Sequence, residues 1–186
     1  DKVILLSFRE EVTTLLTGDE TYEQRKEAIS KLHNKDNKTL LFEAIMQTAD
    51  MADALKNNHR KVVIVISDGE DFAVGTSTSE EAKAALNVRN MPVYAMGIKD
   101  TNMDNLNQFG EFARSLGGNL SLFSASETTD VLFDIKDAIS NTWVVTLKAD
   151  NNCVNNQLNT VKLDVLSTGI SRRKEVMLSQ YEKDTE

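Results

Sequence analysis

The sequence has 186 residues, 40% of them hydrophobic, so the chain is long enough to bury a core of its own. Its net charge of −8 argues against nucleic acid as a partner, because a phosphate backbone is held by a basic surface. No window approaches the roughly 20 apolar residues that a membrane helix needs, and no basic and then apolar leader opens the chain. We expect a soluble globular protein. Its one cysteine, Cys153, excludes an internal disulfide and is interpreted as a loop thiol.

The first third of the chain predicts a hairpin followed by two helices. Residues 3–8 are continuously apolar, and their connection to residues 12–17 is so short that only an antiparallel pair fits, with the second strand at an edge. A capping box that begins at Thr21 predicts a helix to about residue 33. From Thr39 a second helix follows, because apolar residues recur at a spacing of 3.6 as far as residue 55.

Residues 62–66 are five consecutive β-branched aliphatic residues, which predicts a strand buried on both faces inside a parallel sheet. Asp68 comes directly after this strand. Ligands of open α/β sheets bind at the carboxyl ends of the strands, so Asp68 is a candidate site residue, and Gly69 allows a sharp turn there. An Asp-Gly pair that does no more than turn the chain is the alternative interpretation.

Strands and helices alternate in the rest of the first 141 residues. We expect helices from residue 77 or 78 to about 89, over 104–116 and over 128–141, and strands over 93–98 and 119–123. This order predicts an α/β domain at residues 1–141, in which a doubly wound, mostly parallel sheet carries helices on both faces.

After residue 142 the hydrophobic period changes to two. Alternating residues at 143–148, 161–165 and 176–179 predict half-buried antiparallel strands. Residues 142–186 are therefore predicted to form an antiparallel β meander appended to the α/β domain. Three short strands are only marginally stable alone, so we expect this appendage to pack on another module.

Four segments, in this order and spacing, resemble a von Willebrand factor type A (VWA) domain. They are residues 39–45, 63–69, 93–98 and 113–118. The resemblance covers residues 1 to about 141 and implies a metal-ion-dependent adhesion site, in which oxygens hold Mg²⁺ or Mn²⁺ and a carboxylate of the ligand protein completes the coordination. By position, Thr39 matches the family's metal-binding threonine and Asp68 its metal-binding aspartate. Hydroxyl and carboxylate oxygens suit such hard ions. A helix N-cap remains the alternative for Thr39.

One element of the family's pattern has no counterpart in the sequence. The family's first strand ends in Asp-x-Ser-x-Ser and supplies most of the metal ligands, whereas residues 3–8 resemble its second strand. Without that strand, its two neighbours would leave backbone groups unpaired at about 1 to 3 kcal/mol each. We hypothesise that another polypeptide supplies the strand, as a nicked N-terminal piece or an exchanged copy. Direct pairing of residues 3–8 with residues 62–66 would contradict this hypothesis.

The resemblance implies a divalent-cation-dependent protein-binding or adhesion module of a larger surface or secreted protein. The alternatives are an intracellular partner-binding subunit of an ATP-driven or metal-insertion assembly, and a scaffold with a vestigial metal site. We expect no enzyme, because the sequence lacks a Gly-x-Gly-x-x-Gly motif, a P-loop, a nucleophile elbow and paired histidine ligands. We also expect no membrane contact by this chain. An extracellular or surface location is expected, with a cytoplasmic one as the alternative.

Overall fold

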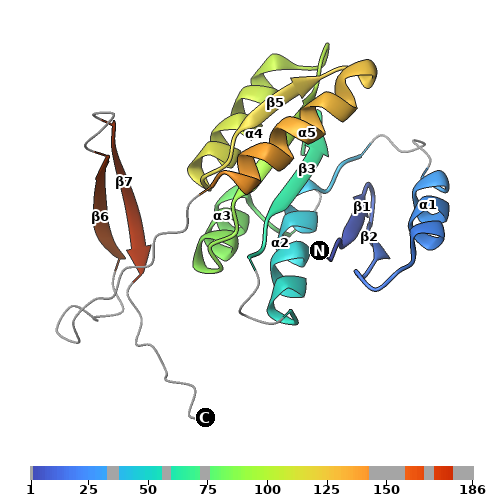
Figure 1. Ribbon diagram of the computed structural model, residues 1–186, viewed down its shortest axis with the longest axis horizontal. Helices are drawn as coiled ribbons and strands as arrows, with labels where there is room; N and C mark the ends of the chain where they lie inside the picture. The colour runs from blue at the N-terminus through green and yellow to red at the C-terminus, as the bar shows by residue number, and fades with distance from the viewer. Residues whose placement is uncertain are drawn as a thin grey trace, which may run out of the picture. The chain divides into compact units, whose positions relative to one another are not determined.

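The computed structural model (Figure 1) describes residues 2–32, 38–55, 60–71 and 76–142, together with the backbone of residues 158–165 and 170–177. The chain divides into two compact units, Asp1–Ser140 and Asn141–Glu186. Among the helices in these ranges, none is long and apolar enough to cross a membrane.

Three parallel strands form the sheet at the centre of the first unit. They are β3 (Val63–Ser67), β4 (Val93–Ile98) and β5 (Leu120–Phe123), in the spatial order β3-β4-β5. Val63 lies opposite Val93 and Ser67 opposite Gly97, so β3 and β4 pair along the whole of β3. Helices α3 (Ser79–Val88) and α4 (Met103–Ser115) connect the strands, as the alternation in the sequence predicts.

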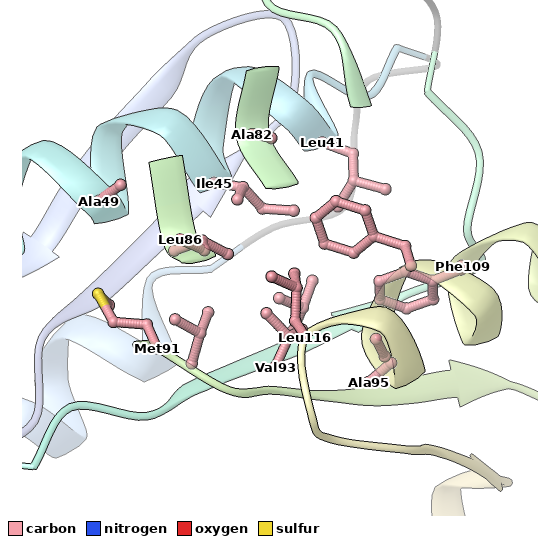
Figure 2. Packing of buried hydrophobic residues seen from close by; sticks show 14 of the residues in the cluster. Leu41, Ile45, Ala49, Ala82, Leu86, Met91, Val93, Ala95, Phe109 and Leu116 are labelled. Carbon is pink, nitrogen blue, oxygen red and sulfur yellow. The ribbon is translucent and has the colours of Figure 1, made fainter. Parts of the chain in front are cut away.

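Helices cover both faces of this sheet. On one face α3, α4 and α2 (Leu41–Asp53) enclose the main core (Figure 2), in which Ile45, Leu86 and Phe109 surround the inward side chains of the sheet. On the other face α5 (Thr128–Ser140) buries Ile135 against Tyr94. The prediction of an α/β fold with helices on both faces of a parallel sheet is confirmed.

The predicted N-terminal hairpin is also present. It consists of β1 (Leu5–Phe8) and β2 (Val12–Leu16), which pair antiparallel, and β2 bonds to β1 alone. Helix α1 (Tyr22–Ser30) follows and begins at the predicted capping box. Within the described part of the chain β1 has no other strand as a partner, so the hairpin forms a sheet separate from β3. The pairing that would contradict the hypothesis of a supplied strand is therefore not seen, and the hypothesis itself stays a prediction.

The expectation that residues 62–66 are buried on both faces is wrong for one face. Val63 and Val65 are each 6% exposed, but Ile64 is 44% and Ile66 47% exposed. The register places Ile64 opposite Tyr94 on the face that α5 covers, where Tyr94 is only 5% exposed. The packing of α5 thus buries β4 and leaves β3 open.

In the second unit β6 (Leu158–Val165) and β7 (Ile170–Met177) pair antiparallel, with Leu158 opposite Met177. They correspond to two strands of the predicted meander. The third predicted strand, at residues 143–148, and Cys153 lie outside the described residues.

The second glycine of the turn after α4 is Gly118, and the surrounding backbone leaves no room there for a side chain. A Cβ atom at Gly118 would overlap the carbonyl oxygen of Val93 at the start of β4. We expect Gly118→Ala to destabilise the chain by about 3 kcal/mol or more, because backbone of the central sheet must move to admit the methyl group. Urea unfolding measures this change.

The matched control is Gly117→Ala. Gly117 has a φ of +82° but open space around its Cβ position, so only the backbone conformation is strained. The expected cost is about 1 to 2 kcal/mol. Equal costs for the two variants would contradict the packing seen at Gly118.

Candidate functional site at the carboxyl end of the parallel sheet

Asp68 is held in a tight turn where β3 ends. Its Oδ1 accepts a hydrogen bond from the Glu70 N–H at 3.0 Å and lies 3.4 Å from the Ser67 hydroxyl. The buried Ser67 hydroxyl also accepts from the Gly69 N–H at 3.1 Å. Both interactions of Asp68 with these neighbours involve Oδ1, so the turn orients a half-buried carboxylate at the end of the sheet where ligands bind.

Gly69 is needed for this turn on two grounds. Its φ is +83°, and a Cβ there would lie 2.7 Å from the Asn105 carbonyl oxygen of α4. The interpretation of the Asp-Gly pair as a turn therefore holds for Gly69. It does not compete with a binding role for Asp68, because the turn itself positions the carboxylate.

Thr39 lies half-buried, two residues before the first residue of α2. The N-cap of α2 is Leu40, and its side chain makes no capping hydrogen bond, so the alternative interpretation of Thr39 as the N-cap does not apply. The cap comes from elsewhere in the chain: Asp71 Oδ1 accepts from the Leu41 N–H at 2.9 Å. A carboxylate at a helix N-terminus also interacts favourably with the helix dipole.

This cap joins the two loops that carry the predicted site residues. Leu41 follows Thr39 by two residues, and Asp71 follows Asp68 by three. A second link lies further along, where Glu43 Oε2 of α2 accepts from the Ser77 N–H at 3.2 Å. Sequence reasoning missed the role of Asp71, since its partner is 30 residues away and nothing local to Asp71 indicates it.

A hollow of about 310 Å³ opens beside these links. Residues of α2, α4, the start of α3 and the loop after β3 line it, namely Leu41, Phe42, Gly69, Glu70, Asp71, Ser79, Asn105, Gln108 and Phe109. Neither Thr39 nor Asp68 is among the lining residues. The hollow is therefore adjacent to the predicted site and distinct from it.

The described residues contain no group of three or more His, Cys, Asp or Glu side chains that could hold a metal ion. Thr39 and Asp68 offer a hydroxyl and a carboxylate, the oxygen donors that Mg²⁺ and Mn²⁺ prefer. The chemical type of these two ligands therefore suits such an ion. They would fill two of the roughly six positions around Mg²⁺.

An ion pair between Lys99 and Glu127 lies at the same end of the sheet, just after β4. Lys99 Nζ lies 2.8 and 2.7 Å from the two carboxylate oxygens of Glu127, which also accepts from the Ser124 N–H at 2.8 Å. The Lys99 ammonium, followed by the Ser124 donors, lowers the pKa of Glu127 to about 2. Glu127 thereby ties the end of β4 to the turn before α5.

The lowered pKa gives this ion pair a defined pH dependence. A carboxyl group whose pKa falls on folding stabilises the fold above its ordinary pKa of 4.5 and loses that contribution as the pH falls toward about 2. We expect Glu127→Gln to lower the melting temperature at pH 7, and the difference from the unaltered chain to shrink between pH 4.5 and 2.5. Glu111→Gln, an exposed change on α4, is the control. A pH-independent difference for Glu127→Gln would contradict the assignment.

The cap of α2 can be tested in the same way. We expect Asp71→Ala to destabilise the chain by about 0.5 to 2 kcal/mol, because the Leu41 N–H loses its acceptor. Glu70→Ala, an exposed neighbour in the same loop, should change the free energy of unfolding by less than about 0.5 kcal/mol. Urea denaturation of both variants measures the difference, and equal effects would argue against the cap.

Comparison with known proteins identifies the family. A model of the von Willebrand factor type A domain matches residues 1–142. The chain belongs to the VWA family. VWA domains are general protein-interaction modules, and many of them bind a divalent metal ion.

The fold of this chain is similar to that of a solved VWA structure. A von Willebrand factor type A structure from Catenulispora acidiphila is 19% identical, with a TM-score of 0.58 over 73% of this chain, and the match spans 32% of that chain. At this identity the likeness concerns the fold alone. An uncharacterized membrane spanning protein from Vibrio fischeri is 15% identical over 74% of this chain and 76% of its own, but with a TM-score of 0.37 its backbone does not share this arrangement closely. No curated protein matches the chain.

Proposed function

We propose that this VWA domain binds a protein ligand through a divalent cation, Mg²⁺ or Mn²⁺, for which Thr39 and Asp68 supply oxygen ligands. The observation that supports the proposal is the hydrogen bond from the Leu41 N–H to Asp71 Oδ1, because it holds the loop of Thr39 against the loop of Asp68. Two hard oxygen donors from distant parts of the sequence thus belong to two loops that are tied together at the ligand-binding end of a parallel sheet.

The charges of these residues favour an acidic ligand. Asp68 contributes one negative charge and Thr39 a neutral hydroxyl oxygen, so they leave much of a divalent ion's charge uncompensated. A carboxylate of the partner protein is the group that this residual charge attracts. Asp71 is a poorer candidate than Asp68, because its Oδ1 already caps α2.

We further propose that this chain is an adhesion module of a larger surface or secreted protein. The intracellular alternative, a partner-binding subunit of an ATP-driven or metal-insertion assembly, would use the same carboxylate-seeking site. A catalytic role is not proposed, since the sequence has none of the nucleotide-binding or nucleophile motifs sought above.

Paramagnetic broadening by Mn²⁺ tests the metal site without knowledge of the protein ligand. When MnCl₂ is titrated into the isotopically labelled 186-residue chain, we expect the strongest broadening at the backbone amides of Thr39 and Asp68. Asp68→Asn should weaken this broadening about tenfold or more. Asparagine retains an oxygen that accepts from the Glu70 N–H but carries no charge, so it separates metal binding from the turn.

Glu70→Gln is the matched control, because it removes a charge from an exposed side chain two residues away. It should leave the broadening at Thr39 and Asp68 unchanged. Broadening that is centred on other acidic residues, or that survives Asp68→Asn at full strength, would indicate a scaffold with a vestigial site.

A further inference from the structure

The hollow beside the candidate metal site has an apolar floor. Leu41 and Phe109 are buried, and Figure 2 shows both at the same end of the main core. Phe42 packs against this core, is half-buried and lines the hollow as well. The volume of about 310 Å³ is that of a small ligand pocket, for which roughly 300 to 1,000 Å³ is typical. The hollow is therefore large enough for one long side chain of a partner.

Polar side chains surround this floor. Asn105 and Gln108 come from α4, Ser79 is the first residue of α3, and Glu70 lies in the loop after β3. Among the described residues, none of these four side chains has a hydrogen-bond or ion-pair partner. They offer two amides, a hydroxyl and a carboxylate to a ligand, and no internal bond has to break first.

The walls of the hollow are fixed by contacts that leave these polar ends available. The Leu41 N–H donates to Asp71 Oδ1 at 2.9 Å, which joins α2 to the loop after β3. The same loop lies close to α4, since a Cβ at Gly69 would be only 2.7 Å from the Asn105 carbonyl oxygen. The hollow is thus preformed, and binding does not have to order its walls.

The charges of the lining select among possible ligands. Glu70 and Asp71 are acidic, and none of the described lining residues is basic. Asp71 caps α2, so Glu70 has the carboxylate that is available to a ligand. An apolar side chain in the hollow would cover Glu70 and the amides of Asn105 and Gln108 without giving them a partner, which is unfavourable. A cationic side chain with several donors satisfies all three groups.

We propose that the hollow binds an arginine side chain of a partner protein. Its guanidinium donates to the Glu70 carboxylate and to the amide oxygens of Asn105 and Gln108, and its flat face and aliphatic stem pack on Phe42. Lysine suits the hollow less well, because its ammonium is a compact, strongly hydrated charge without a flat face. The inference takes from the proposed function only that the ligand is a protein, and this contact is separate from the metal site.

Titration with a small arginine derivative tests the hollow without the partner and without a metal ion. N-acetyl-arginine methylamide is added to the isotopically labelled 186-residue chain in the presence of EDTA, and NMR spectra are recorded. We expect saturable shifts of the side-chain amides of Asn105 and Gln108 and of the Glu70 backbone amide. The matching derivatives of lysine, citrulline and norleucine should each bind at least about threefold more weakly, because they lack the charge or the planar donors.

Two variants of α4 form a matched pair. Gln108→Lys places a positive charge beside the expected guanidinium and should weaken binding of the arginine derivative about tenfold or more. Asn107→Lys adds the same charge at an exposed neighbour that does not line the hollow, so it should bind like the unaltered chain. Both positions are exposed, and the spectra themselves show that each variant is folded. Glu70→Gln should weaken binding about fivefold, through loss of the charge-assisted hydrogen bonds.

Three results would overturn the proposal. They are the absence of saturable shifts at the hollow, equal binding of the arginine and norleucine derivatives, and equal binding by Gln108→Lys and Asn107→Lys. Because EDTA removes divalent ions, each of these results is independent of the Mn²⁺ experiment. A failure of the arginine site is therefore distinguishable from a failure of the proposed metal site.

Discussion

The parallel ladder between β3 and β4 is the interaction on which the rest of the domain depends. It places Val63 and Val65 in the core and brings Asp68 to the end of the sheet where ligands bind. It also directs the other backbone edge of β3 away from β4. Within the described part of the chain β3 therefore pairs on one side only, and it is less buried than β4, which pairs on both sides.

One hydrogen bond, from the Leu41 N–H to Asp71 Oδ1, holds the two loops of the candidate site together. The N-terminus of α2 has free N–H groups that its own N-cap residue does not satisfy, and Asp71 meets this need from the loop after β3. The acidic residue that secures the loops is thus separate from the acidic residue proposed to bind a cation. This division leaves Asp68 available for a ligand while the structure around it stays fixed.

The strand that ends just before Asp68 is also the strand at the edge of the described sheet. The carboxyl ends of β3, β4 and β5 lie at this same edge, because parallel strands share their carboxyl ends. VWA domains are general protein-interaction modules.

The sequence by itself determined the elements and their order. The capping boxes at Thr21 and Thr78, the hydrophobic periods and the strand at residues 62–66 depend on contacts within a few residues, so they can be predicted from local patterns. Only the tertiary structure decided that Ile64 and Ile66 are exposed and that Asp71 caps α2. A run of aliphatic residues shows that a strand can be buried, but burial depends on what packs over it. In the same way, a helix cap 30 residues away depends on how the chain folds back, which no local pattern encodes.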